Sequence, residues 1–379
     1  MIGKNAGAPM MAADGSTHDT SALVDEVRGL HCSPFWADVQ KIIAPEMRPA
    51  TKPHVWRFAE IEPRLRRAAQ LVPVEEAERR AFVFLNPGLP GRIATTPTLY
   101  AAYSIYNGGE HAPVHRHTAS AARIGLFGAG GYTTVEGEKC QIGRGDLVLT
   151  PNWAWHDHGN DGTQPNIWFD ILDVPLTMYL SALLFDMDYR EAGGAPVANR
   201  SIQTPRRVEN GSTNRFGFGG IVPQLPAASE TRSTGERQYF YRWENTRKAL
   251  DLAKGSGFDP HRGVSVRLTD PRSGGPATAT IDFCAKLLPP GTRTSQHRHM
   301  ANSVFLVMEG RGYSDIGGER FEWKENDVVC VPTWTWHEHV NVDPKREAVL
   351  YDMTDAPLMS SLACYRRQGR DAQGREVSI

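Results

Sequence analysis

Eight of the thirteen histidines of this chain lie in two clusters whose spacing suits a metal ion. The first cluster contains His115, His117, His156 and His158, and the second contains His297, His299, His337 and His339. In a strand, residues i and i+2 point to the same side, so each H-x-H pair presents two imidazoles on one face. A third histidine about 40 residues later can complete a three-histidine site. Imidazole suits Zn, Cu, Fe and Ni alike, so the ligands alone do not choose the metal.

The clusters belong to an internal duplication. Residues 109–117 read G-E-H-A-P-V-H-R-H, and residues 291–299 read G-T-R-T-S-Q-H-R-H. The blocks P-N-W-A-W-H-D-H-G-N and P-T-W-T-W-H-E-H-V-N start at Pro151 and Pro332. His297 lies 182 residues after His115, and His337 lies 181 residues after His156. A single H-x-H pair often only packs within a strand, but the repetition of the whole arrangement favours metal binding in each copy.

Short runs with β-branched or alternating residues separate the blocks within each copy. Residues 131–135 and 327–331 are such runs. A glycine-containing turn at 136–137 follows the first run, and another at 317–318 precedes the second. This pattern is typical of short antiparallel strands that close a small barrel. The sequence therefore predicts one β-barrel per copy.

The rest of the chain sets the expected domain limits. We expect an α-helical N-terminal arm over residues 1–90, with helices at 63–71 and 74–82. The first barrel is expected over 91–186, a connector with some helix over 187–275, and the second barrel over 276–362. Residues 363–379 are charged and contain glycine, which predicts a mobile C-terminal tail.

Composition excludes several classes of protein. Lys and Arg number 42 against 43 Asp and Glu, so the chain has no basic excess for nucleic acid. No apolar run is long enough to span a bilayer, and residues 1–20 lack the apolar core of a secretory signal, which predicts a cytoplasmic protein. The five cysteines form no C-x-x-C pair, which argues against a disulfide framework or a thiolate zinc site.

The motifs resemble those of a known superfamily. G-x5-H-x-H at Gly109 and P-x-W-x-x-H-x3-N at Pro151 are similar to the paired motifs of cupins, and two copies suggest a bicupin. That resemblance implies a mainly β protein with two tandem antiparallel jelly-roll β-barrels and an α-helical N-terminal arm. The usual cupin glutamate is absent, because Ala121 and Ala122 occupy its places in the first copy.

The strings H-R-H-T, T-P-N-W-A-W-H-D-H-G-N and F-L-N-P-G-L-P-G resemble the gentisate 1,2-dioxygenase family over about residues 50 to 362. This family includes dioxygenases for salicylate, 5-substituted salicylates and 1-hydroxy-2-naphthoate. The resemblance implies Fe(II) held by His115, His117 and His156, O2 as co-substrate and opening of the C1–C2 bond of a 2-hydroxybenzoate. It also implies a homotetramer.

Comparison of the two copies separates substrate residues from scaffold. Arg123 corresponds to Phe305, so a cation beyond the histidine pair exists only in the first copy, where it could bind a substrate carboxylate. We therefore expect the first barrel to be catalytic and the second to be structural, although His297, His299 and His337 can still bind metal. Asp170 and Trp155 recur as Asp352 and Trp336, so they could serve the barrel as well as a substrate.

Further positions follow from the family resemblance. His158 is similar to an acid/base or substrate-orienting histidine, and Arg79, in preference to Arg80, to an arginine near the substrate. The family segment L-[WY]-A-G-L-Q appears as residues 99–104, in which Tyr100 fits the pattern, Ala102 replaces glycine and Ser104 replaces glutamine. These two replacements favour a 5-substituted salicylate, such as the 5-nitro compound, or a fused ring over gentisate.

Two other functions share the same residues. A cupin isomerase or hydrolase could use Zn or Mn without O2, since one fold serves many chemistries. A non-catalytic bicupin could simply bind a ligand, although Arg123 beside three histidines argues against it. Metal analysis together with oxygen consumption separates these alternatives.

Overall fold

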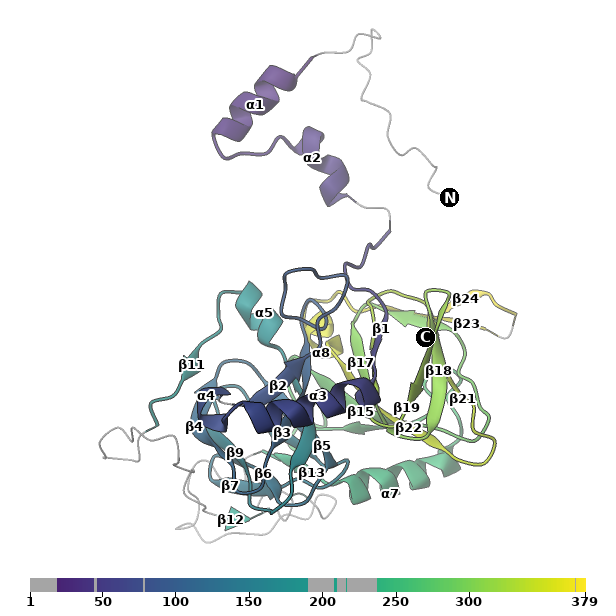
Figure 1. The fold of residues 1–379 in the computed structure, drawn as a ribbon. Helices are drawn as coiled ribbons and strands as arrows, with labels where there is room; N and C mark the ends of the chain where they lie inside the picture. The colour runs from purple at the N-terminus through teal and green to yellow at the C-terminus, as the bar shows by residue number, and fades with distance from the viewer. Residues whose placement is uncertain are drawn as a thin grey trace. The chain divides into compact units, whose positions relative to one another are not determined.

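The structure is a computed structural model that describes residues 19–43, 46–77, 79–189, 208–209, 216, 237–371 and 373–379. The chain divides into two units, Met1–Arg48 and Pro49–Ile379. The first unit contains helices α1 (Ser21–Gly29) and α2 (Phe35–Ile42). The strands of the described residues all lie in the second unit, which forms two β-domains (Figure 1).

The first β-domain consists of two six-stranded sheets. One has the order β13 (Phe240–Tyr241), β8 (Leu147–Thr150), β5 (Ala121–Phe127), β10 (Asn166–Leu172), β3 (Tyr100–Tyr106) and β2 (Arg80–Val83). The other has the order β11 (Phe185–Asp186), β4 (His111–His117), β9 (His156–Asn160), β6 (Gly131–Val135), β7 (Glu138–Gln141) and β12 (Val208–Glu209). Apart from the parallel pair β12 and β7, the neighbouring strands are antiparallel.

The second β-domain repeats this plan with two further sheets of six strands. Its first sheet has the order β1 (His54–Trp56), β20 (Val328–Val331), β17 (Ser303–Glu309), β22 (Ala348–Thr354), β15 (Asp282–Leu288) and β14 (Val264–Leu268). Its second sheet has the order β19 (Glu319–Lys324), β18 (Arg311–Ile316), β21 (His337–Asn341), β16 (His297–His299), β23 (Arg367–Arg370) and β24 (Glu376–Ser378). The predicted duplication and the mainly β architecture are confirmed.

Strand register makes the two copies directly comparable. Arg123 pairs with Asp170 across β5 and β10, as Phe305 pairs with Asp352 across β17 and β22. Both antiparallel pairs have a register shift a few residues farther along, next to Trp168 in the first copy. The equivalence read from the sequence offsets therefore holds at the level of backbone hydrogen bonding.

The N-terminal prediction is partly wrong. Residues 63–71 lie in helix α3 (Phe58–Leu71), as expected, but α4 covers only Val74–Ala77, and the residues after Arg79 form β2. Pairing with the buried strand β3 outweighs the helical tendency of the Glu- and Arg-rich segment, since propensity is weak against tertiary contacts. The N-terminal segment is therefore not wholly helical: it supplies β2 to the first β-domain and β1 to the second.

The C-terminal prediction is wrong as well. The expected mobile tail forms β23 and β24, and β23 pairs with β16 through His297 and Gly369. Of the predicted connector, residues 190–207, 210–215 and 217–236 lie outside the described residues. Its described parts include β12, β13, helix α7 (Trp243–Ala253), the short 3-10 turn η2 (Lys254–Ser256) and β14. The domain limits given above remain a prediction.

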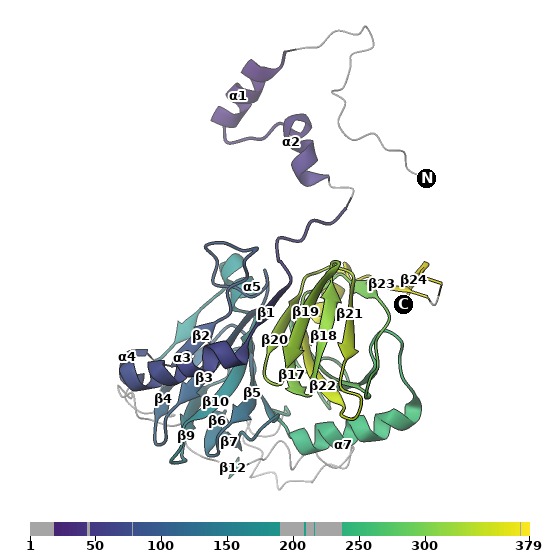
Figure 2. The same cartoon turned by 45° about the vertical axis from the view of Figure 1, so that its right-hand side comes forward.

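One apolar core joins the two β-domains. It contains the odd-numbered residues Ala101, Tyr103 and Ile105 of β3 together with Phe283 and Ala285 of β15, all of them buried. The domains lie side by side, and α7 lies beneath the second of them, as Figure 2 shows. Short helices α5 (Val174–Tyr179) and α8 (Ala356–Ser361) follow equivalent strands in the two copies. Within the described residues, no helix combines the length and apolar character needed to span a membrane.

Candidate metal centre

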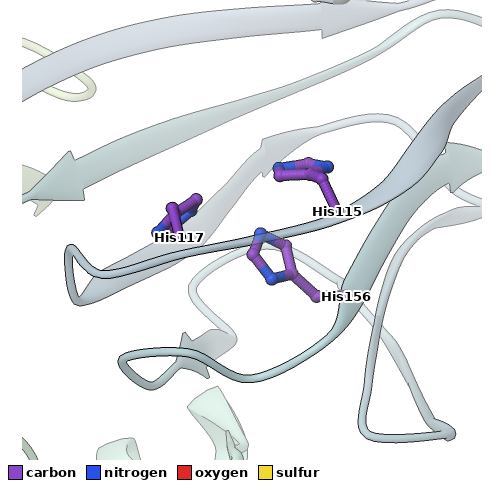
Figure 3. A group of neighbouring side chains, drawn as sticks. All are labelled: His115, His117 and His156. Carbon is purple, nitrogen blue, oxygen red and sulfur yellow. The ribbon is translucent and has the colours of Figure 1, made fainter. Parts of the chain in front are cut away.

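Three histidines of the first β-domain converge in its interior. His115 and His117 lie on one face of β4, and His156 pairs with His115 from the neighbouring strand β9. The ring centroid of His156 lies 4.3 Å from that of His115 and 4.8 Å from that of His117. All three side chains are fully buried. Figure 3 shows the three imidazoles turned toward a common point. Their nearest ligand atoms lie within 4.8 Å of one another, which suits a single metal ion.

Backbone carbonyls orient these rings. Each Nδ1 lies 2.8–2.9 Å from a carbonyl oxygen two residues away: Pro113 for His115, Ala119 for His117 and Ala154 for His156. These partners place the proton on Nδ1 and leave Nε2 as the ligand atom. Among the described residues, the buried Nε2 atoms of His117 and His156 have no hydrogen-bond partner, which a metal ion would provide.

The protonation state also suits a metal. Burial lowers the pKa of His115 and of His117 to about 3, and it holds the pKa of His156 well below the usual value. Neighbouring histidines add to the effect at His117 and His156. The three imidazoles are therefore neutral near pH 7, as metal ligands must be.

A buried ion pair lies beside the triad. Arg123 Nε is 3.1 Å from Asp170 Oδ1, and both residues are almost completely buried. Arg123 Nη1 donates to Thr150 Oγ1 at 2.9 Å, and Ser104 Oγ donates to Asp170 Oδ2 at 2.5 Å. The structure thus brings together three residues singled out in the sequence, namely Arg123, Asp170 and Ser104.

His158 completes the histidine cluster. Its ring centroid lies 5.2 Å from that of His156 and 5.6 Å from that of His115. Its Nδ1 lies 3.0 Å from Thr133 Oγ1. Burial, reinforced by the Arg123 charge, holds the pKa of His158 well below the usual value, so this imidazole is neutral as well.

The structure distinguishes the two candidate arginines. Arg79 is half-buried, and its charge contributes to the lowered pKa of His115 and of His158, which places it near the cluster. Arg80 instead forms an ion pair with Glu110 and donates to the carbonyl of Ala69, at the junction with α3. Of these two arginines, Arg79 is therefore the one close to the triad.

The remaining predicted residues fall into two groups. Tyr100, Ala102 and Ser104 share one face of β3, and Ala102 pairs with Asp170. Trp155 differs, because its ring stacks on the guanidinium of Arg116 at 4.4 Å. This contact recurs in the second β-domain, where the ring of Trp336 lies 4.6 Å from Arg298. Trp155 therefore packs on the side of β4 opposite His115 and His117, where it can serve the barrel.

Three residues near the cluster are missing from the sequence-based set. Thr150 and Thr133 hold Arg123 and His158, but threonine is common in strands and gave no signal of its own. The ring centroid of Phe185 lies 5.0 Å from that of His117, because β11 pairs with β4 at this position. Phe185 lies at the end of the predicted first barrel, and only tertiary pairing brings it to the histidines.

A second triad occupies the equivalent place in the second β-domain. His337 pairs with His297 across β21 and β16, and the ring centroid of His337 lies 4.1 Å from that of His297 and 5.1 Å from that of His299. Each Nδ1 again lies within hydrogen-bond distance of a backbone carbonyl. The ligand atoms again lie within 4.8 Å of one another.

Comparison with known proteins identifies the family of this chain. Residues 102–172 and 286–354 match the family model described as a cupin domain. A 5-aminosalicylate 1,2-dioxygenase from Comamonas sp is 33% identical, with 96% of this chain and 94% of that protein covered. Gentisate 1,2 dioxygenase 1 from Aquipseudomonas alcaligenes is 34% identical, with 92% and 96% covered.

A solved structure also covers nearly the whole chain. The crystal structure of salicylate 1,2-dioxygenase from Pseudoaminobacter salicylatoxidans in adducts with gentisate has a TM-score of 0.79 and 28% identity. The match spans 95% of this chain and 99% of that chain. Together with the duplicated histidine motifs, these matches show that the chain belongs to the gentisate and salicylate 1,2-dioxygenase family of two-domain cupins.

Proposed function

We propose that this protein is an Fe(II)-dependent dioxygenase that opens the C1–C2 bond of a 2-hydroxybenzoate, with its iron held by His115, His117 and His156. The observation that carries the proposal is the position of the buried Arg123–Asp170 pair next to three convergent neutral imidazoles. A metal with open positions can take a chelating hydroxy acid, and a guanidinium can take its carboxylate. The family to which the chain belongs consists of ring-cleaving dioxygenases with this kind of substrate.

The donor set fits iron. Three neutral nitrogen ligands leave the full positive charge on a divalent ion, which favours an anionic chelating substrate. Iron(II), when bound there, would supply the electron-transfer chemistry between the ring and O2. The protein's part is to bind the substrate in one orientation, to exclude water and to hold protons at defined atoms.

Arg123 is proposed to bind the substrate carboxylate. Asp170 and Thr150 hold its guanidinium from two sides, so the planar group has a fixed orientation before the substrate arrives. A carboxylate can accept two parallel N–H bonds from such a group. Ser104, which donates to Asp170, would act as a positioning residue for this pair.

His158 and Arg79 are proposed to complete the site. With Nδ1 held by Thr133, the Nε2 atom of His158 can accept the proton of the ring hydroxyl. Arg79 adds a second positive charge near the histidines, which stabilises a substrate that carries both a carboxylate and a phenolate. Phe185 would cover the triad beside β4 and limit the access of water.

The face of β3 that carries Tyr100, Ala102 and Ser104 is proposed to select the ring substituent. The double variant Ala102→Gly/Ser104→Gln restores the residues that the family usually has at these places. Position 104 is fully buried, and glutamine is larger than serine. A glutamine at this position should therefore exclude bulky 5-substituents. We expect the ratio of kcat/KM for gentisate to kcat/KM for 5-nitrosalicylate to rise about tenfold.

Steady-state kinetics with both substrates measures this ratio. Ser104→Ala serves as the control, because it removes the hydroxyl group without adding bulk. We expect it to lower activity on both substrates without reversing their order. An unaltered ranking in the double variant would show that these two positions do not set specificity.

The proposed activity is tested with an oxygen electrode. Iron-loaded protein is assayed with gentisate, salicylate, 5-nitrosalicylate and 1-hydroxy-2-naphthoate, and the products are identified by mass spectrometry. We expect one O2 consumed per ring opened and a product heavier than the substrate by two oxygen atoms. Turnover by the zinc or manganese form without O2 would favour an isomerase or hydrolase, and binding without turnover would favour a ligand-binding protein.

We also propose a cytoplasmic homotetramer as the working form of the protein. The resemblance noted in the sequence supports this assembly. Light scattering coupled to size-exclusion chromatography measures the mass directly, and a monomer of 42.0 kDa at working concentration would contradict it.

A further inference from the structure

The second histidine triad opens onto a cavity of about 950 Å³. His297 and His299 line it, together with side chains from β14, β15, β22 and helix α8. This volume is sufficient for a small organic ligand. The triad of the second β-domain is therefore accessible to more than a metal ion.

A cation stands beside this triad, although sequence comparison at Phe305 predicts none. Lys286 Nζ lies 2.8 Å from Asp352 Oδ2, and both side chains are nearly buried. Lys286 faces Leu350 across β15 and β22, as Ser104 faces Trp168 across β3 and β10. The aspartate of each copy thus has a cationic partner, which comes from β5 in the first copy and from β15 in the second.

The charge of the cavity favours an anion. Five cationic side chains line it against three carboxylates. The cations are Arg237, Arg262, Arg267, Lys286 and Arg367, and the carboxylates are Asp270, Asp282 and Asp352. Arg267 pairs with Asp282, whereas Arg262 and Arg367 form no ion pair within the part of the chain that the structure describes. Two guanidinium groups at the cavity are therefore not neutralised by described carboxylates.

Two buried polar atoms at this site also lack hydrogen bonds. Among the described residues, His337 Nε2 and Thr354 Oγ1 have no such partner. Buried polar atoms in proteins nearly always have one. A metal ion would satisfy the imidazole, and a ligand or its bound water would satisfy the hydroxyl group.

We propose that the second β-domain is a second metal and ligand site, in which His297, His299 and His337 hold a divalent metal ion and Lys286 binds a small carboxylate anion. Lys286 offers a point charge in place of the planar fork of Arg123, and Phe305 fills the place of that arginine. The ring of Phe305 lies 5.0 Å from Lys286 Nζ and gives the ligand an apolar neighbour. The site therefore suits a monocarboxylate with an apolar body. Lys286 would hold its carboxylate with a single charged group, whereas Arg123 can form two parallel hydrogen bonds.

Metal content tests the first part of this proposal. Protein reconstituted with Co(II) should contain two equivalents per chain by elemental analysis, and His297→Ala should contain one. His337→Gln provides a second variant in case the alanine variant does not fold. One equivalent in the unaltered protein, retained in both variants, would overturn the proposal.

Ligand binding tests the second part. In the Co(II) form of His115→Ala, the visible absorption of the remaining ion reports on the second site alone. Benzoate should change this spectrum in a saturable way, and benzamide, which lacks the charge, should not at the same concentration. Lys286→Gln should weaken benzoate binding at least tenfold, and Lys345→Ala, at an exposed position, should leave it unchanged.

The double variant Lys286→Gln/Asp352→Asn removes both charges together and avoids an isolated buried carboxylate. It should fold and should bind benzoate as weakly as the single variant. A spectrum that ignores benzoate, or one that responds equally with and without Lys286, would overturn the ligand assignment. These measurements do not use turnover, so they stand or fall independently of the proposed dioxygenase activity.

Discussion

His115→Ala should abolish turnover and remove one equivalent of bound iron per chain. The substitution deletes one of three nitrogen ligands and leaves a cavity where the imidazole was fully buried. Two ligands bind a divalent ion far more weakly than three, and without the metal no O2 chemistry is available. Iron analysis and oxygen consumption on the same preparation measure the two effects together.

His111→Ala is the matched control for this prediction. His111 lies on the same strand, but its Nδ1 is 2.9 Å from the hydroxyl group of Tyr132, and it is not part of the triad. This variant should keep its iron and most of its activity. Full iron content and full activity in His115→Ala would contradict the assignment of the first metal centre.

Arg123→Ala should lower kcat/KM by about tenfold to a hundredfold while the iron is retained. A charge-assisted contact to a carboxylate typically contributes about 1.5–3 kcal/mol, which corresponds to this range. Arg123→Lys should recover only part of the loss, because an ammonium group cannot form two parallel hydrogen bonds. Arg92→Ala, at an exposed position, should behave as the unaltered protein.

Arg123→Ala will also affect stability, because it leaves Asp170 buried without its cation. Breaking a buried pair in this way typically costs about 3–5 kcal/mol. The two roles of Arg123 are separated by comparing the binding of salicylate with that of catechol, which has no carboxylate. Carboxylate recognition requires that the variant lose affinity for salicylate and keep it for catechol. Equal losses for both would show that Arg123 serves only the fold.

The strand-borne part of the site could be predicted from the sequence. An H-x-H pair in an alternating run can only present both imidazoles on one face, and the duplicated spacing made this pattern specific. The equivalence of Arg123 and Phe305 could be predicted as well, because the strand registers of the two copies agree. Lys286 lies 182 residues after Ser104, so the same offset could have revealed it. The cation of the second copy lies on β15, two strands away from Phe305 on β17, so it does not appear at the position that corresponds to Arg123.

Other features could not be read from local patterns. The segment after Ala77 has a helix-forming composition, and only its pairing with β3 makes it a strand. Phe185 reaches the triad through a two-residue pairing that no periodicity can signal. Trp155 recurs in both copies, but it precedes β9, so strand alternation does not fix the direction of its side chain. These cases depend on contacts between residues far apart in the chain.

The crossing of one strand between the two copies limits how the gene can be rearranged. Strand β1 precedes the first β-domain in the chain but pairs with β20 of the second. A cut between the copies would therefore strip this edge strand from the second β-domain and expose unpaired backbone that favours aggregation. Shuffling of single domains between relatives is therefore a poor route to new enzymes in this architecture. A copy that lost its own chemistry would still serve the fold, because the two copies share one apolar core.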